Sequence, residues 1–278
     1  MIEYRPLAVC LAGLEEARQL LQEVFPRSKQ FTPDYMHWMY TCNPAGPAIG
    51  YNAYCDNQLV AHVAAHRLYS SLGSQFEPGI LLHNVATRPE FQGKGIFKKL
   101  LHKCFESART QGCTHMLAVP NSNSTPGFVR SLKCQFVGSL SARIVLGKPH
   151  FQPVNLEYQR IWPTEQLKWR LSWPGRRYSS WQRWILGNTG MAGLRALLSY
   201  TPREDARFCS LANWLERLPI YLWIGLDPTL NWRGTFYWEI PLRLRPAPLN
   251  LVFLDLTAQQ RILDPAKVAF CALDFDIY

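Results

Sequence analysis

Two glycines separated by one residue, Gly93 and Gly95, lie between a run of strand-forming residues and an amphipathic helix. A turn from a strand into a helix leaves backbone N–H groups unpaired at the positive end of the helix dipole, and such groups bind phosphate. Glycine lets the main chain approach an anion that a side chain would keep away. The segment 84–97 therefore predicts a site for a pyrophosphate group.

The sequence around this loop supplies the elements that would position it. Residues 79–87 are mostly apolar and predict a buried strand, and an apolar stripe in residues 97–108 predicts a helix with lysines on its other face. The other elements expected in the first half are a helix at 14–25, a hairpin formed by 49–54 and 59–68 around Asp56-Asn57, a strand at 115–119, a helix at 126–132 and a β stretch at 135–146.

The loop matches an acyl-CoA signature in part. Gln92-Gly-Lys-Gly95 fits the pattern [Gln/Arg]-x-x-Gly-x-[Gly/Ala], except that Phe97 occupies its last small position, and Val85-Ala-Thr-x-Pro-Glu-Phe precedes it. Over residues 1–146 the order of elements also agrees, so the chain resembles the GNAT superfamily of acyl-CoA-dependent N-acyltransferases. The resemblance implies acetyl-CoA or another acyl-CoA as co-substrate, without a metal.

The resemblance also implies which residues bind the cofactor. A second segment, 118–138, is similar to the family's next motif, in which an Asn after the strand contacts the cofactor; Asn123 matches it best and Asn121 next. Both could instead be turn or N-cap residues. The cofactor-binding residues expected are Val85, Ala86, Thr87, Gln92, Gly93, Lys94, Gly95, Ile96, Phe97 and Asn123.

For catalysis the resemblance implies direct attack of an amine on the thioester, with a backbone N–H near Val85 or Ala86 polarising the carbonyl oxygen. Glu77 and His83 are the candidates for the base that takes the proton of the amine. Many relatives place a Tyr on the helix after the Asn, to protonate the departing thiolate, but this chain has Phe128 there. Water would then have to supply that proton, since the pKa of a thiol is about 8.5.

Composition limits the other classes of function. Hydrophobic residues form 47% of the 278-residue chain, which excludes a largely disordered protein. No apolar run approaches the roughly 18 residues that span a bilayer, so we expect a cytoplasmic protein with no membrane span. The net charge of +10 favours an anionic ligand, but no nucleic-acid-binding motif accompanies it. His62 and His66, four apart in a strand, would lie about 13 Å apart, so no metal site is expected.

Beyond residue 147 tryptophan and arginine become frequent, which suggests a second unit. The segment around Trp169 weakly repeats the segment around Trp38. We therefore predict an α/β (α+β, mixed-sheet) protein with a GNAT-type acyl-CoA-binding domain at 1–148 and a degenerate GNAT-like αβ domain at 149–278. A strand-rich accessory lobe is the alternative for the second domain, where strands are expected at 235–244, 249–254 and 268–275.

The function predicted from these features is transfer of an acetyl or other acyl group from acyl-CoA to an amine. The acceptor would be a small molecule, phosphorylated or nucleotide-linked, and the second unit would recognise it or form a homodimer surface. One alternative is transfer of a longer acyl chain from CoA or from an acidic acyl carrier protein. A non-catalytic acyl-CoA sensor is another, because of Phe128. Nucleic-acid binding rests on charge alone.

Overall fold

A computed structural model describes residues 1–147, 149–173, 178–181, 184–188, 195–200, 220–245 and 249–275. In this part of the chain the first half contributes strands β1 (Ile2–Pro6), β2 (Ile49–Cys55), β3 (Gln58–Leu72), β4 (Gln75–Thr87), β5 (His115–Ala118), β6 (Gln135–Ser139) and β7 (Ser141–Leu146). The second half contributes β8 (His150–Phe151), β9 (Tyr158–Ile161), β10 (Tyr178–Trp181), β11 (Trp184–Asn188), β12 (Arg195–Tyr200), β13 (Ile220–Leu226), β14 (Leu230–Asn231), β15 (Phe236–Glu239), β16 (Asn250–Asp255) and β17 (Val268–Cys271).

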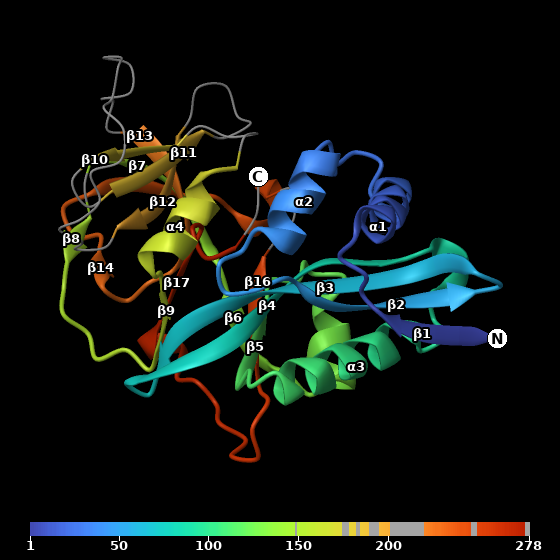
Figure 1. The fold of residues 1–278 in the computed structure, drawn as a ribbon. Coiled ribbons are helices and arrows are strands. Elements are labelled where there is room, and N and C mark those ends of the chain that lie inside the picture. The colour runs from blue at the N-terminus through green and yellow to red at the C-terminus, as the bar shows by residue number, and fades with distance from the viewer. Residues whose placement is uncertain are drawn as a thin grey trace.

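The helices in the same residues are α1 (Leu11–Val24), α2 (Pro33–Thr41), α3 (Ile96–Thr110) and α4 (Thr164–Leu171). Short helical turns occur at Pro89–Phe91, Gly127–Ser131, Leu242–Leu244 and Pro265–Lys267. Helices α1 and α2 cover one face of the sheet formed by β1 to β4, and α3 covers the other (Figure 1). The apolar stripe predicted for α3 is buried against this sheet.

The hairpin predicted at Asp56-Asn57 is confirmed. Both residues have positive φ angles, of 50° and 62°, which Asn and Asp tolerate better than most residues because their short polar side chains fit the left-handed region. Strands β2 and β3 pair on either side of this turn, and β3 then pairs with β4. Three long neighbouring strands therefore form the rigid centre of the first half.

Strands β4 and β5 run parallel but pair only from Gly79 opposite His115 to Leu81 opposite Leu117. Strand β4 continues to Thr87 without a partner on that side. Beyond Leu81 the two strands therefore separate, and the backbone groups on this edge of β4 are free to bind a ligand.

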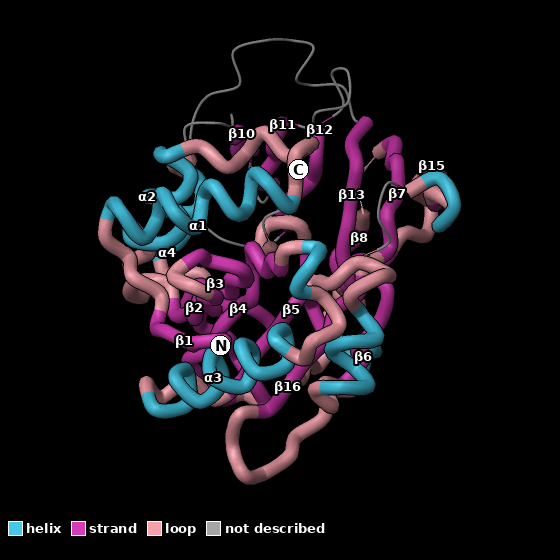
Figure 2. The backbone as a smooth tube through the Cα atoms, turned by 90° about the vertical axis from the view of Figure 1, so that its right-hand side faces the viewer, coloured by secondary structure: helices cyan, strands magenta, loops and turns pink. Residues whose placement is uncertain are grey.

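The two halves share one mixed sheet, which Figure 2 shows as strands crossing the molecule. Strand β16, from the second half, lies between β5 and β6 and pairs antiparallel with both. Strand β7, from the first half, pairs with β13 and β15. Strands on either side of the boundary expected at residue 148 thus pair with one another. Lys148 itself lies outside the described residues, and the two-domain division stays a prediction.

The two segments that resemble each other in sequence also contact each other. Trp38 of α2 and Trp169 of α4 stack with ring centroids 5.0 Å apart. The indole Nε1 of Trp38 donates to the backbone oxygen of Trp169 at 3.0 Å, and Nε1 of Trp169 donates to the backbone oxygen of Trp38 at 3.1 Å. This reciprocal contact is what a local two-fold relation between the segments would produce.

Most expected elements are confirmed, with some differences. Helix α2 and strand β1 were not predicted. For α2 the reason is that its aromatic residues lie on several sides of the helix and form no single apolar stripe. The strand expected at 235–244 ends at Glu239, since Pro241 cannot donate a ladder hydrogen bond and begins a helical turn instead. Arg176, Arg177 and Arg183 belong to the arginine-rich part of the second half, and they lie outside the described residues, as does Cys209.

Candidate active site

A cleft of about 700 Å³, here called the main cleft, opens where β4 and β5 separate. One wall is the free edge of β4 from Leu82 to Thr87, the opposite wall is the chain from Ala118 to Phe128, and the end is the turn before α3. Residues 24 and 25, at the end of α1, border it as well. The cleft is long and open, as a site for an extended ligand must be.

The glycine loop lies at one end of the main cleft. Gly93 and Gly95 have φ angles of 73° and 74°, and a Cβ at either position would meet no atom within 4 Å. The left-handed backbone, rather than crowding, therefore requires glycine here. No side chain caps the first turn of α3 and no acidic residue lies in it, so its N–H groups can bind an anion.

Strand β4 contains a bulge beside the middle of the cleft. His62 pairs with Ala86 and Ala64 with His83, so Asn84 and Val85 together lie opposite Val63. A bulge leaves one residue unpaired, which frees a backbone N–H there. Asn84 has a φ angle of 50°. Its Nδ2 donates to the hydroxyl oxygens of Tyr40, at 3.1 Å, and Tyr35, at 3.3 Å, and these contacts hold the bulge in place.

The two asparagine candidates, Asn121 and Asn123, lie on the opposite wall and differ in their hydrogen bonds. Oδ1 of Asn121 accepts hydrogen bonds from the backbone N–H groups of Asn123 and Ser124, both at 3.0 Å. Asn121 is therefore a turn residue. The side chain of Asn123 is exposed, lines the cleft and makes no hydrogen bond within the described residues. Phe128 is buried and contacts Phe97 edge-to-face at 5.5 Å, so it presents a ring and no hydroxyl to the cleft.

All but one of the cofactor-binding residues expected from the sequence line the main cleft. The exception is Lys94, whose Nζ lies 4.9 Å from the ring centre of Phe91 at the edge of the loop. Sequence reasoning missed Asn84 as part of the site, although it is the first residue of the segment that carried the resemblance. A positive φ angle in a strand is a property of the folded chain, and the sequence signal for it, an Asn within an apolar run, is weak.

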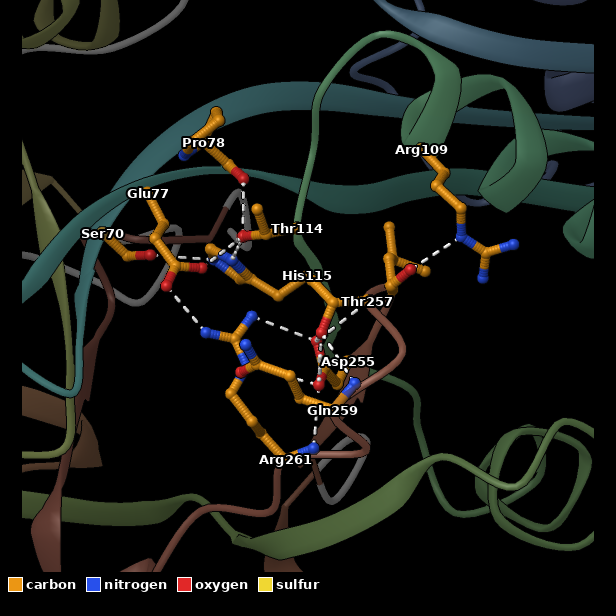
Figure 3. Close-up of polar contacts among 11 residues, drawn as sticks. Ser70, Glu77, Pro78, Arg109, Thr114, His115, Asp255, Thr257, Gln259 and Arg261 are labelled. Atoms are coloured by element: carbon orange, nitrogen blue, oxygen red, sulfur yellow. Dashed lines mark hydrogen bonds and ion pairs between the residues drawn. The ribbon is translucent and has the colours of Figure 1, made fainter.

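Glu77 is at the start of β4 and does not line the main cleft. Its carboxylate faces Arg261 and Thr114 (Figure 3). Its Oε1 lies 2.7 Å from Nη1 of Arg261, and its Oε2 accepts a hydrogen bond from Thr114. Arg261 also contacts Asp255 at 3.0 Å. Burial alone would raise the pKa of Glu77, but the hydrogen bonds from Arg261 and Thr114 outweigh it and lower the pKa. The geometry does not support Glu77 as the base; it ties the loop after β16 to β4 and β5.

His83, the other candidate base, lines the main cleft. Neither ring nitrogen has a hydrogen-bond partner among the described residues. Burial, with a smaller effect of His62, lowers the pKa of His83 to about 3. The edge of its ring faces Tyr40, with centroids 5.3 Å apart. His83 is therefore a neutral imidazole at the bulge, able to accept a hydrogen bond or a proton from a ligand.

A second cavity of about 310 Å³, here called the side cavity, adjoins the main cleft. The two share the residues of β4 around the bulge. Its lining residues are Phe25, Ser28, Gln30, Phe31, Tyr35, His66, Leu81, Leu82, His83, Asn84, Val85, Val119 and Phe275. His66 and Phe275 were not expected from the sequence, because residues distant in the chain meet here.

Two further findings concern the described part of the chain only. Within it, no group of three or more His, Cys, Asp or Glu side chains could hold a metal ion. No helix in the same residues is long and apolar enough to cross a membrane. Cys134 is in the core beside α3, and burial raises the pKa of its thiol to about 12, so it does not act as a nucleophile.

Comparison with known proteins agrees with this geometry. The model of the Acetyltransferase (GNAT) family matches residues 14–126. No curated protein matches the chain. One similar solved structure is a conserved protein of Enterococcus faecalis V583, a probable N-acyltransferase, at 13% identity and a TM-score of 0.61, covering 94% of this chain and 74% of that one.

Two more solved structures cover both halves. A GCN5-related N-acetyltransferase from Kribbella flavida has 14% identity and a TM-score of 0.57, covering 91% of this chain and 71% of its own. The N-myristoyltransferase of Saccharomyces cerevisiae, with bound myristoyl-CoA, has 11% identity and a TM-score of 0.56, covering 91% and 82%. These likenesses show a shared fold, and the family match places a GNAT acetyltransferase domain at residues 14–126 of this chain.

Proposed function

We propose that this chain transfers an acetyl group from acetyl-CoA to the nitrogen of an amine by direct attack. The observation that carries the proposal is the main cleft, which joins an open anion-binding loop at one end to a strand bulge in its middle. Along acetyl-CoA the pyrophosphate is followed by an extended arm and then by the thioester. Along the main cleft the glycine loop is followed by the free edge of β4 and then by the bulge. An activity that consumes acyl-CoA also fits the cytoplasmic location expected from the sequence.

The residues of the main cleft match the parts of acetyl-CoA. The N–H groups between Gly93 and the first turn of α3 would bind the pyrophosphate. The free edge of β4 would pair with the amides of the pantetheine arm, and Asn123 would contact the arm from the opposite wall. When bound, acetyl-CoA supplies a thioester whose carbonyl carbon an amine can attack.

The chain's own groups would assist the attack in three ways. The free backbone N–H at the bulge, beside Asn84 and Val85, donates to the carbonyl oxygen as negative charge develops on it. His83 accepts the proton that the amine nitrogen loses. Phe128 cannot donate a proton, so water protonates the departing thiolate, which is a fair leaving group because the pKa of a thiol is about 8.5.

Transfer of a longer acyl chain is the second candidate. The side cavity adjoins the bulge and is mostly apolar, so it could hold the chain of a larger acyl group. The solved N-myristoyltransferase, which shares the fold, contains myristoyl-CoA. The net charge of +10 would also attract an acidic acyl carrier protein. A homodimer surface on the second half stays a prediction.

Binding of CoA by calorimetry and release of thiol with a panel of amines test the proposal together. Acetyl-CoA, octanoyl-CoA and octanoyl-acyl carrier protein are compared as donors. Asn123→Ala should raise the Kd for acetyl-CoA about 3- to 10-fold, as expected for the loss of one hydrogen bond of about 1 kcal/mol. Ser122→Ala, at an exposed neighbour that does not line the cleft, is the matched control.

The possible results separate the candidates. A higher kcat/KM with octanoyl donors would favour the longer chain over acetyl. Binding of acetyl-CoA without thiol release for any amine would identify a sensor rather than an enzyme. Failure to bind any of CoA, acetyl-CoA and octanoyl-CoA would overturn the proposal.

A further inference from the structure

The side cavity lies where an acceptor would approach the thioester, and its walls indicate which amines fit. This inference rests on the proposed acetyl transfer. Residues of the loop between α1 and α2 line the cavity, and it adjoins the main cleft at His83, Asn84 and Val85. A molecule in it would therefore present its nitrogen at the bulge.

Aromatic rings from distant parts of the chain form the walls. Phe25 and Phe31 come from the loop between α1 and α2, and Phe275 comes from the segment after β17. Phe275 is 2% exposed, and its ring is parallel to that of Phe270, at 5.3 Å between centroids and 6° between planes. The second half of the chain thus supplies a flat wall to the site of the first.

Arg170 of α4 holds this wall in place. Its Nε donates to the backbone oxygen of Leu273 at 3.1 Å, and its Nη2 donates to the backbone oxygen of Phe275 at 3.3 Å. Its Nη1 donates to the hydroxyl of Tyr178. These bonds engage all three nitrogens of a buried guanidinium, so Arg170 fixes the tail, and it does not itself line the side cavity.

The side cavity contains two buried imidazoles whose ring nitrogens have no hydrogen-bond partner among the described residues. His66 is 4% exposed, and neither of its ring nitrogens is hydrogen-bonded to a described residue; the same holds for His83. The two rings stack with centroids 5.5 Å apart, and both line the side cavity. Leaving buried polar atoms unpaired is unfavourable, so a ligand with an N–H group would be stabilised here.

The charges around the cavity disfavour a cation. No Asp or Glu among the described residues lines it. Burial lowers the pKa of His66 well below its ordinary value, and the positive charge of Arg160 lowers it further. An ammonium group would enter without a counter-ion, and burying an unpaired charge is costly. The acceptor nitrogen should thus be uncharged before it binds, which at neutral pH distinguishes aromatic amines from alkylamines.

We propose that the side cavity is the acceptor site and that it binds an uncharged aromatic amine, with its ring between Phe31 and Phe275 and its N–H group donating to His83. The nitrogen lone pair forms the C–N bond to the acetyl carbon as the C–S bond breaks. One N–H proton passes to His83 and from there, through water, to the departing sulfur. The products are the N-acetylated arylamine and CoA with a free thiol, so atoms and electrons balance.

The test measures thiol release and the mass of the product with acetyl-CoA and three probes: aniline, benzylamine and O-phosphoethanolamine. Benzylamine keeps the ring but is a cation at neutral pH, and O-phosphoethanolamine represents a phosphorylated acceptor. Acetanilide should form with a kcat/KM at least 10-fold above that for either other probe. Phe275→Ala should raise the KM for aniline several-fold, and Phe275→Leu should restore part of it.

Thermal unfolding and acetyl-CoA affinity show whether each variant is folded and keeps its cofactor site, and both should be unchanged in Phe275→Leu. Phe76→Ala, at an exposed ring outside both cavities, is the matched control. Acetyl-CoA binding without acetanilide, or faster acetylation of O-phosphoethanolamine or benzylamine, would overturn this inference alone. So would weaker octanoyl-CoA binding in Phe275→Ala, which would assign the cavity to an acyl chain. Absence of acetyl-CoA binding would overturn the proposed function itself.

Discussion

Replacing Gly93 by aspartate should weaken acetyl-CoA binding much more than replacing it by asparagine. Gly93 is exposed, has a φ angle of 73° and has open space where a Cβ would lie. Asn and Asp have nearly the same size and tolerate the left-handed region better than other side chains, so both variants should fold with a similar loss of at most about 1 kcal/mol. The difference between them is one negative charge.

That charge would face the pyrophosphate. Two unit charges 4 Å apart repel by about 1 kcal/mol in water and about 4 kcal/mol at an effective dielectric of 20. Because the loop is exposed, we use the lower figure for each of the two phosphate charges, which gives about 2 kcal/mol, or about a 30-fold ratio between the two Kd values. The ratio should shrink in 1 M salt, where the screening length is about 3 Å.

Calorimetry with two ligands measures this effect. Acetyl-CoA carries the pyrophosphate and S-acetylpantetheine lacks it, so the charge should change only the affinity for acetyl-CoA. Equal Kd values for acetyl-CoA in Gly93→Asp and Gly93→Asn at low salt would refute the assignment of the loop to the pyrophosphate. An equal loss for S-acetylpantetheine would point instead to distortion of the loop.

Three further predictions concern stability. Trp169→Ala should lower the free energy of unfolding by about 3–5 kcal/mol, because it removes a buried ring stacked on Trp38. Trp238 is 49% exposed, so Trp238→Ala should lower it by about 0.5 kcal/mol or less. Urea unfolding measures both values, and similar losses would argue against the α2–α4 contact. Gly79→Ala should destabilise by about 1–3 kcal/mol, because its Cβ would lie 2.3 Å from Nε2 of His115; an unchanged melting temperature would contradict the close packing there. Burial would raise the pKa of Asp255, but hydrogen bonds from Arg261 and the backbone outweigh it and lower the pKa to about 2. This carboxylate should therefore stabilise the fold above about pH 4 and lose that effect as the pH falls towards 2. Asp255→Asn should reduce the pH dependence of the free energy of unfolding measured from pH 5 to 2, and an unchanged pH dependence would exclude this role of Asp255.

The positions of the two catalytic candidates, Glu77 and His83, show what could not be predicted from the local sequence. Glu77 and His83 lie six residues apart in one strand, and both are chemically able to act as a base. Only the fold brings Arg261 to Glu77, and only the separation of β4 from β5 beyond Leu81 opens the cleft that His83 lines. The partner of an ionisable side chain comes from anywhere in the chain, so its role cannot be read from its neighbours in sequence.

By itself the sequence determined the features that depend on short segments. The positive φ angles of Gly93 and Gly95, the turn at Asp56-Asn57 and the amphipathic stripe of α3 all follow from local steric and hydrophobic rules, and they predicted the loop and its family. Tertiary structure alone decided the side cavity and the place of β16 within the sheet of the first half. These join segments more than a hundred residues apart, such as His66 and Phe275, because burial of apolar surface selects contacts by shape rather than by sequence distance.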